Sequence, residues 1–176
     1  LHSLGKLETL LIQIAGITGN AEVDLSRRGL IAMCADNGVV EEGVTQTGQE
    51  VTAIVAENFL KYDTSVGVMC KQNHAEIFPV DMGMVTDTKV RTDHKIAYGT
   101  QNMTKGPAMT REQAVKGLEA GIDMVRELND KGYRILATGE MGIGNTTTSS
   151  AVASVLLKQP VEEMTGRGAG LTSEGL

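Results

Sequence analysis

Hydrophobic residues in this chain gather either in short continuous runs or in longer stretches with helical spacing. The continuous runs cover residues 30–35, 76–81 and 133–137, and each has the length and aliphatic content of a strand. Such runs are typical of strands that are buried on both faces of a parallel sheet. Pro79 interrupts the second run, and proline cannot donate a hydrogen bond to a sheet ladder.

Apolar residues at helical spacing predict the helices that separate these strands. The predicted helices cover residues 4–15, 49–61, 64–73, 110–131 and 147–157. Thr110 and Gln113 fit a capping box at the start of the fourth helix, and Gly132 fits a cap at its end. Its predicted buried stripe consists of Ala114, Val115, Leu118, Ile122, Val125 and Leu128. Strands separated by helices form β–α–β units, so the sequence predicts an α/β fold with a parallel sheet.

The segment 133–157 combines a strand, a glycine-rich turn over 138–147 and a helix. Backbone N–H groups at such a helix N-terminus can bind an anion. The segment nearly fits the phosphate-loop pattern G-x-x-x-x-G-K-[ST], but Asn145 stands where the lysine belongs. The pattern therefore indicates a phosphomonoester rather than a nucleoside triphosphate. A glycine-rich turn without a ligand is the alternative. Glu140 is the one acidic residue in this turn.

Composition excludes several classes of protein. The chain of 176 residues carries a net charge of −6, which argues against nucleic acid and anionic membranes as main partners. No apolar run is long enough to span a bilayer. Cys34 and Cys70 form no C-x-x-C motif, which predicts a reducing, cytoplasmic location. No metal site is predicted, because His2, His74 and His94 lack partners at ligand spacing.

Acidic residues follow two of the predicted strands. Asp36 ends the first strand, before Asn37 and Gly38. It could hold a ligand hydroxyl, or it could form a turn through local backbone hydrogen bonds. Asp81 follows the second strand and allows the same two interpretations, of which the turn is favoured.

Taken together, several segments resemble one family, the nicotinate-nucleotide–dimethylbenzimidazole phosphoribosyltransferases of cobalamin lower-ligand assembly. GEMGIGNTT, at 139–147, is the most specific of these motifs. The resemblance runs along the whole chain in the family's order, through LGKLETLLIQIAGITG (4–19), MCADNGVVEEGVTQTGQEVT (33–52), NMTKGPAMTREQA (102–114), TGEMGIGNTTTSSA (138–151) and GRGAGL (166–171).

The resemblance implies a Rossmann-like parallel sheet flanked by helices. Residues 1–20 would be a helical segment of a smaller domain, and 21–176 would be an α/β phosphoribosyltransferase domain truncated at its C-terminus. The expected partners are small molecules, nicotinate mononucleotide and a benzimidazole-type base, and the expected assembly is a homodimer. The expected reaction moves 5-phosphoribosyl between them to give α-ribazole 5′-phosphate and nicotinate, with no metal or organic cofactor.

The resemblance also assigns roles to individual residues. Glu140 would be catalytic. The base and ribose would contact Asp36, Thr47, Val55, Met141 and Gly142. The phosphate would be held by Gly144, Asn145, Thr146, Gly166, Arg167, Gly168 and Ala169.

The resemblance further implies that part of the enzyme lies outside this sequence. The family's general base is a glutamate that would lie beyond Leu176. The chain also lacks an initiator methionine, so we interpret it as a fragment. Without the family's glutamate, we expect this fragment to be inactive by itself. The alternative functions are a non-catalytic phosphate- or nucleotide-binding fragment and a subunit that needs a partner chain.

Overall fold

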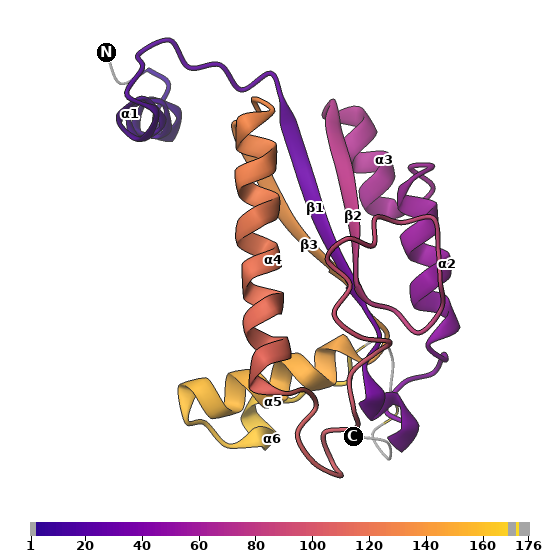
Figure 1. The fold of residues 1–176 in the computed structure, drawn as a ribbon. Helices are drawn as coiled ribbons and strands as arrows, with labels where there is room; N and C mark the ends of the chain where they lie inside the picture. The colour runs from indigo at the N-terminus through magenta and orange to yellow at the C-terminus, as the bar shows by residue number, and fades with distance from the viewer. Residues whose placement is uncertain (1–2, 169–171, 173–176) are drawn as a thin grey trace.

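The strands of the chain form a three-stranded parallel sheet. The computed structural model describes residues 3–168 and 172. The sheet has the order β2–β1–β3, and its strands are β1 (Arg28–Ala35), β2 (Ala75–Gly83) and β3 (Ile135–Met141). The predicted α/β fold with a parallel sheet is therefore confirmed (Figure 1).

Helices cover both faces of this sheet (Figure 1). Helices α2 and α3 lie on one face, and α4 crosses the other face on the way from β2 to β3. In chain order the helices are α1 (Lys6–Thr18), the 3-10 helix η1 (Gly38–Glu42), α2 (Glu50–Phe59), α3 (Ser65–Gln72), α4 (Arg111–Asp130), α5 (Asn145–Leu157) and α6 (Val161–Met164). Helices α5 and α6 lie beyond the carboxyl ends of the strands, with η1 nearby.

The core has one apolar cluster on each face of the sheet. On the α2 side, Ala56 and Phe59 pack against Cys34 of the central strand. On the α4 side, Met124 and Leu128 pack against Ile31 of the same strand. β1 is therefore buried on both faces, as its continuous apolar run predicts.

Pro79 is accommodated because β2 is an edge strand. The backbone N–H of Asp81 donates to the carbonyl of Arg91, on the side of β2 away from β1. Alternate residues of a strand direct their backbone groups to the same side, so the nitrogen of Pro79 also faces outward. The ladder with β1 therefore loses no hydrogen bond at the proline.

The predicted buried stripe of α4 is mostly wrong, since Leu128 is buried and Ala114 partly buried but the other four residues are exposed. Leu118, for example, is 72% exposed, and the side chains buried against the sheet are Ala120, Met124 and Leu128. The helix carries two apolar stripes, and the one that includes Ala120, Met124 and Leu128 is buried. The other stripe, Val115, Leu118, Ile122 and Val125, faces away from the sheet. The capping box is confirmed, since both hydrogen bonds between Thr110 and Gln113 are present.

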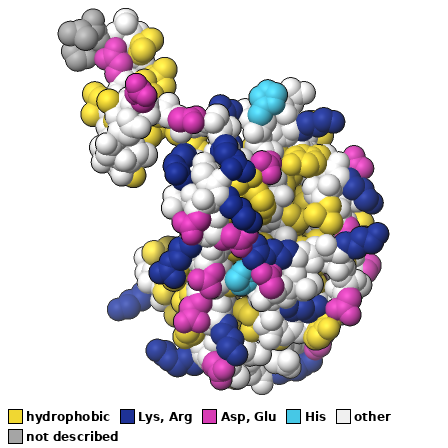
Figure 2. Space-filling view, turned by 45° about the horizontal axis from the view of Figure 1, so that its top comes forward, with side chains coloured by type: hydrophobic (Ala, Val, Ile, Leu, Met, Phe, Trp, Pro, Cys, Tyr) yellow, Lys and Arg dark blue, Asp and Glu magenta, His cyan; other side chains and the backbone are white. Residues whose placement is uncertain are grey.

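Helix α1 stands apart from the sheet and projects as a separate lobe (Figure 2). None of the residues described for this helix is buried, and Ile12 and Ile17 are largely exposed. The predicted helix is confirmed, whereas its assignment to a smaller domain stays a prediction. Over residues 3–168 and 172, no helix has the length and apolar character needed to cross a membrane.

Candidate active site

The carboxyl ends of β1 and β3 meet the N-terminus of α5 (Figure 1). β3 continues to Met141, so Glu140 belongs to the strand, where it lies opposite Met33 of β1. The predicted turn over 138–147 is therefore wrong at both ends. Only residues 142–144 connect β3 to α5, because pairing with β1 carries the strand through Gly139 and the helix already begins at Asn145.

Two glycines shape this three-residue loop. A Cβ atom on Gly142 would lie 2.2 Å from the carbonyl oxygen of Ala35, so no side chain fits there. Gly144 has a φ of 87° and forms the N-cap of α5 in the left-handed region. That conformation is costly for other residues. The close approach of the loop to the end of β1 therefore requires a glycine at 142, and the left-handed backbone conformation favours a glycine at 144.

Glu140 is tied to the first residue of α5. Its carboxylate accepts a hydrogen bond from the side-chain amide of Asn145. Partial burial raises the pKa of the Glu140 carboxyl above its usual value, and the hydrogen bond from Asn145 opposes this shift. The residue as a whole is exposed. The hydrogen bond with Asn145 therefore orients the side chain and leaves it accessible to a ligand.

A small cavity of about 120 Å³ lies at the N-terminus of α5. Its lining residues come from two segments, Val44–Thr47 after η1 and Ile143–Thr146 across the loop. Within the described residues, no side chain caps the first turn of α5. The amides of Asn145, Thr147 and Thr148 donate to the carbonyls of Gly142 and Gly144. The helix dipole and the amide of Thr146 therefore favour an anion in the cavity.

Gly168, in the GRGAGL motif at 166–171, lies at the same end of α5. A Cβ atom on Gly168 would lie 2.7 Å from the hydroxyl oxygen of Thr146, so the two residues are in close contact. Arg167 is exposed next to it, whereas a Cβ atom on Gly166 would meet no atom within 4 Å. Ala169, the last predicted phosphate residue, lies outside the described residues. In the described part of the chain, no group of three His, Cys, Asp or Glu residues could hold a metal ion.

Comparison with known proteins identifies the family. A family model described as phosphoribosyltransferase matches residues 1–176. The nicotinate-nucleotide–dimethylbenzimidazole phosphoribosyltransferase of Ruminiclostridium cellulolyticum is 51% identical over 178 residues, which cover 100% of this chain and 51% of the relative. This chain belongs to the nicotinate-nucleotide–dimethylbenzimidazole phosphoribosyltransferase family. The resemblance stated from its motifs is thereby confirmed.

Further relatives agree with this assignment. The enzyme of the same name from Clostridium tetani is 48% identical over 175 residues, covering 98% of this chain and 48% of the relative. The crystal structure of CobT from Thermus thermophilus superposes with a TM-score of 0.89 at 36% identity, covering 99% of this chain and 53% of that one. The phosphoribosyltransferase chain thus spans about half the length of the relatives it matches.

The cavity brings together only some of the residues that the sequence indicates for the phosphoribosyltransferase site. Thr47, Gly144, Asn145 and Thr146 line it. Val55 and Met141 instead pack against the core cluster on the α2 side.

Asp36 is fully buried at the end of β1. Its Oδ2 accepts a hydrogen bond from the backbone N–H of Val85 at 2.8 Å, while Oδ1 has no hydrogen-bond partner within the described residues. Asp81 forms the favoured turn, because its Oδ1 accepts from the backbone N–H groups of Gly83 and Met84. Its Oδ2 also lies 3.1 Å from Lys95 Nζ. Asp81 is therefore engaged within its own turn.

Two side chains that contact the 142–144 loop were not predicted from the sequence. Asn37 Nδ2 donates to the carbonyl of Ile143 at 3.0 Å, and the backbone N–H of Ile143 donates to Thr52 Oγ1 at 3.1 Å. Asn37 carries a weak signal, since it follows the central strand. Thr52 carries none, because a threonine in an amphipathic helix has no pattern of its own.

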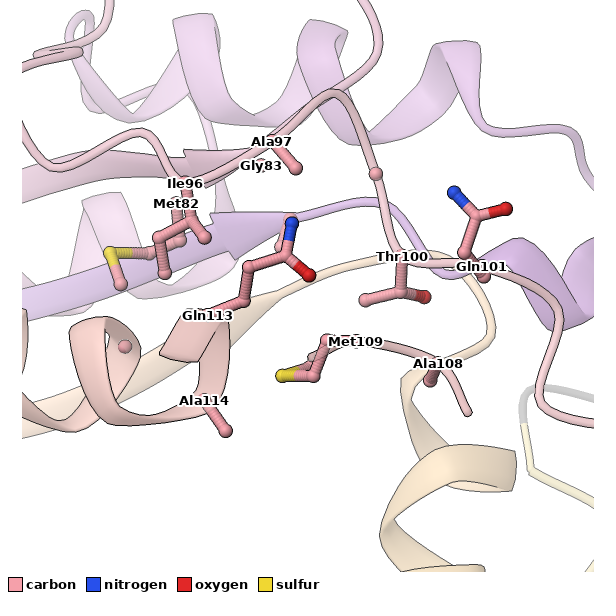
Figure 3. Close-up of a pocket in the computed structure, with 13 residues that line it drawn as sticks. Met82, Gly83, Ile96, Ala97, Thr100, Gln101, Ala108, Met109, Gln113 and Ala114 are labelled. Atoms are coloured by element: carbon pink, nitrogen blue, oxygen red, sulfur yellow. The ribbon is translucent and has the colours of Figure 1, made fainter. Parts of the chain in front are cut away.

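A larger, mostly apolar cavity of about 240 Å³ lies on the α4 side of the sheet. Figure 3 shows Met82 and Ile96 on its sheet side, Met109 just before α4 and Gln113 in the first turn of that helix. Backbone hydrogen bonds hold its rim, including Ile96 N to Met82 O at 3.0 Å. None of the predicted site residues lines this cavity.

Gly117→Ala is expected to stabilise the protein by about 1 kcal/mol, because alanine is the better helix former in the interior of α4. The new Cβ would lie 3.4 Å from Ile96 Cδ1, an ordinary contact at the wall of the 240 Å³ cavity. Thermal unfolding should show a melting temperature higher by about 2–4 °C.

Gly121→Ala is the matched control, since its Cβ would meet no atom within 4 Å. It should gain the helix propensity alone, so the difference between the two variants measures packing at the cavity wall. A melting temperature below wild type for Gly117→Ala would contradict the prediction.

Proposed function

We propose that the protein transfers the 5-phosphoribosyl group of nicotinate mononucleotide to 5,6-dimethylbenzimidazole or a related base in cobalamin biosynthesis. The products are α-ribazole 5′-phosphate and nicotinate. Membership of the phosphoribosyltransferase family and the names of the relatives support this reaction. The observation that carries it is the cavity at the N-terminus of α5, whose lining residue Asn145 is hydrogen-bonded to the carboxylate of Glu140 on the adjoining strand.

In the proposed reaction, a nitrogen of the benzimidazole attacks C1 of the ribose. The bond from C1 to the cationic pyridine nitrogen breaks, and its electron pair stays with nicotinate, which leaves as a neutral pyridine. A general base takes the N–H proton of the benzimidazole, which typically contributes about 100- to 10,000-fold. We assign this base, following the family resemblance, to a glutamate outside the present sequence. The carboxylate of Glu140 stabilises the positive charge that develops on the ribose.

The proposed phosphate site uses backbone groups rather than a lysine. Gly144, Asn145 and Thr146 lie at the positive end of the α5 dipole and are proposed to hold the phosphate there. Gly166, Arg167, Gly168 and Ala169 are proposed to complete the site, and the contact between Gly168 and Thr146 supports this role for Gly168. A site without a lysine at position 145 suits a phosphomonoester.

The proposed base pocket lies on the α2 side of the loop. Thr47 lines the cavity, and Val55 and Met141 pack against one apolar cluster on that side of the sheet. The apolar side chains of Val55 and Met141 and the hydroxyl of Thr47 are proposed to contact a flat benzimidazole, as the family resemblance implies. Asp36, buried at the end of β1, is proposed to act near this pocket.

A cytoplasmic homodimer is also part of the proposal. Two buried, unpaired cysteines, Cys34 and Cys70, suit a reducing compartment. The exposed apolar stripe of α4 and the exposed leucines of α1 suit a subunit contact. Sedimentation of the complete protein should give a mass near two chains.

A phosphoribosyl-transfer assay tests the proposed reaction directly. The complete protein, with nicotinate mononucleotide and 5,6-dimethylbenzimidazole, should release nicotinate and form α-ribazole 5′-phosphate in equal amounts. Residues 1–176 alone should bind phosphate weakly without turnover. Phosphate binding by the complete protein with no product would instead favour the alternative, a non-catalytic phosphate-binding protein.

A further inference from the structure

We propose that Asn37 and Thr52 are positioning residues that hold the 142–144 loop in its anion-binding shape. The identity of the anion in this inference rests on the proposed function, whereas the hydrogen bonds that support the positioning role are observed independently of that function. Both backbone groups of Ile143 are bound by side chains from distant parts of the chain: its carbonyl by Asn37 Nδ2 at 3.0 Å and its N–H by Thr52 Oγ1 at 3.1 Å.

Ile143 occupies the middle of the loop, between Gly142 and Gly144, and belongs to neither β3 nor α5. Its backbone groups therefore take no part in a sheet ladder or a helix, and side chains must satisfy them. Ile143 also lines the 120 Å³ cavity directly. The two hydrogen bonds thus fix one wall of the proposed phosphate site.

Asn37 joins this loop to the start of α2 and to α5. Its backbone carbonyl accepts a hydrogen bond from Gln49 Nε2 at 3.1 Å, just before α2. Its Oδ1 lies 3.4 Å from Thr148 Oγ1 in the first turn of α5, and the Thr148 hydroxyl also donates to the carbonyl of Asn145 at 2.9 Å. A Cβ atom on Gly144 would lie 3.4 Å from Asn37 Cβ, so the loop rests against the side chain. Asn37 therefore sets the distance between the end of β1 and the α5 N-terminus.

Thr52 contributes from a different element. It is fully buried in α2, the helix that follows the Val44–Thr47 segment on the opposite wall of the cavity. Removing its hydroxyl would leave the N–H of Ile143 without this acceptor. An unsatisfied buried donor is costly, so the loop should move to recover a partner. The amides of the α5 first turn would then point less accurately at the anion.

The test compares Thr52→Val with Thr52→Ser in the complete protein. Valine has the shape of threonine without the hydroxyl, and serine keeps the hydroxyl. Thr52→Val should speed hydrogen exchange at the Ile143 amide and raise the Kd for inorganic phosphate about tenfold, the effect of one lost buried hydrogen bond. Thr52→Ser should retain most of the protection and stay within about threefold of wild type in phosphate affinity. Asn37→Ala should weaken phosphate binding similarly.

Steady-state kinetics separates positioning from general destabilisation. The KM for nicotinate mononucleotide should rise about tenfold in Thr52→Val, with the KM for the benzimidazole changed far less. Unchanged phosphate affinity and unchanged KM in folded Thr52→Val and Asn37→Ala would overturn the proposal, even if their melting temperatures fall. If wild type makes no α-ribazole 5′-phosphate, the proposed function fails, and the phosphate and hydrogen-exchange measurements still decide the role of the two residues.

Discussion

Glu140→Gln in the complete protein is expected to lower kcat by about 100-fold, the scale for removing one preorganised electrostatic group. Glutamine keeps an oxygen that can accept the hydrogen bond from Asn145, so the side chain should stay in place. It loses the negative charge that faces the developing positive charge of the ribose. The KM for nicotinate mononucleotide should change less than about threefold, because the loss falls mainly on the transition state.

The pH dependence gives this prediction a second test. Burial raises the pKa of the Glu140 carboxyl, and only the ionised form can stabilise a cation. Activity should therefore be present above this pKa and be lost as the pH falls through it. Asn145→Ala removes the hydrogen bond that lowers the pKa, so its acid limb should move to higher pH. Unchanged turnover in Glu140→Gln would remove Glu140 from the mechanism.

The strands and the parallel sheet were predictable because their signals are local. The apolar run of residues 30–35 marks a strand buried on both faces, and β1 is the central strand. The capping box at Thr110 depends on residues three apart, and it is present. Such features are set by neighbours in sequence, so residue types alone determine them.

Features that depend on distant partners were not predictable. The sequence places a turn at Thr138, but pairing with β1 extends β3 to Met141. On α4, hydrophobic spacing predicted that Leu118 is buried, whereas the fold buries Ala120 and leaves Leu118 exposed. In both cases tertiary contacts decided between two locally acceptable arrangements.

The same distinction between local and distant partners applies to the residues of the candidate site. Thr47 and the Gly144–Thr146 segment were indicated by motif, and they share one cavity. Asn37 and Thr52 were missed, because their partner Ile143 is 106 and 91 residues away in sequence. Hydrogen bonds between a side chain and a distant backbone group leave no periodic pattern. They become visible only when the fold is known.

Gly142→Ala is expected to destabilise the protein by about 2–3 kcal/mol, the scale for forcing extra volume into a packed site. The new Cβ would lie 2.2 Å from the carbonyl oxygen of Ala35, which belongs to the central strand and cannot turn aside. The same Cβ would lie 2.9 Å from Glu140 Oε1 and from Asn37 Nδ2. The melting temperature should fall by about 4–10 °C, to be measured by calorimetry.

The loop itself must move to relieve this contact, and activity should suffer more than stability. A displacement of about 1 Å in a catalytic site can cost about 100-fold, so kcat/KM should fall at least that far in the fraction that remains folded. Gly139→Ala is the matched control in the preceding strand, since its Cβ would lie 3.3 Å from the end of the Leu30 side chain and 3.5 Å from Ile31 O. A side-chain end can yield where a backbone carbonyl cannot, so Gly139→Ala should stay within about 1 kcal/mol of wild type. If Gly142→Ala matched Gly139→Ala in both stability and activity, the close approach of the loop to Ala35 would not be what holds the site in shape.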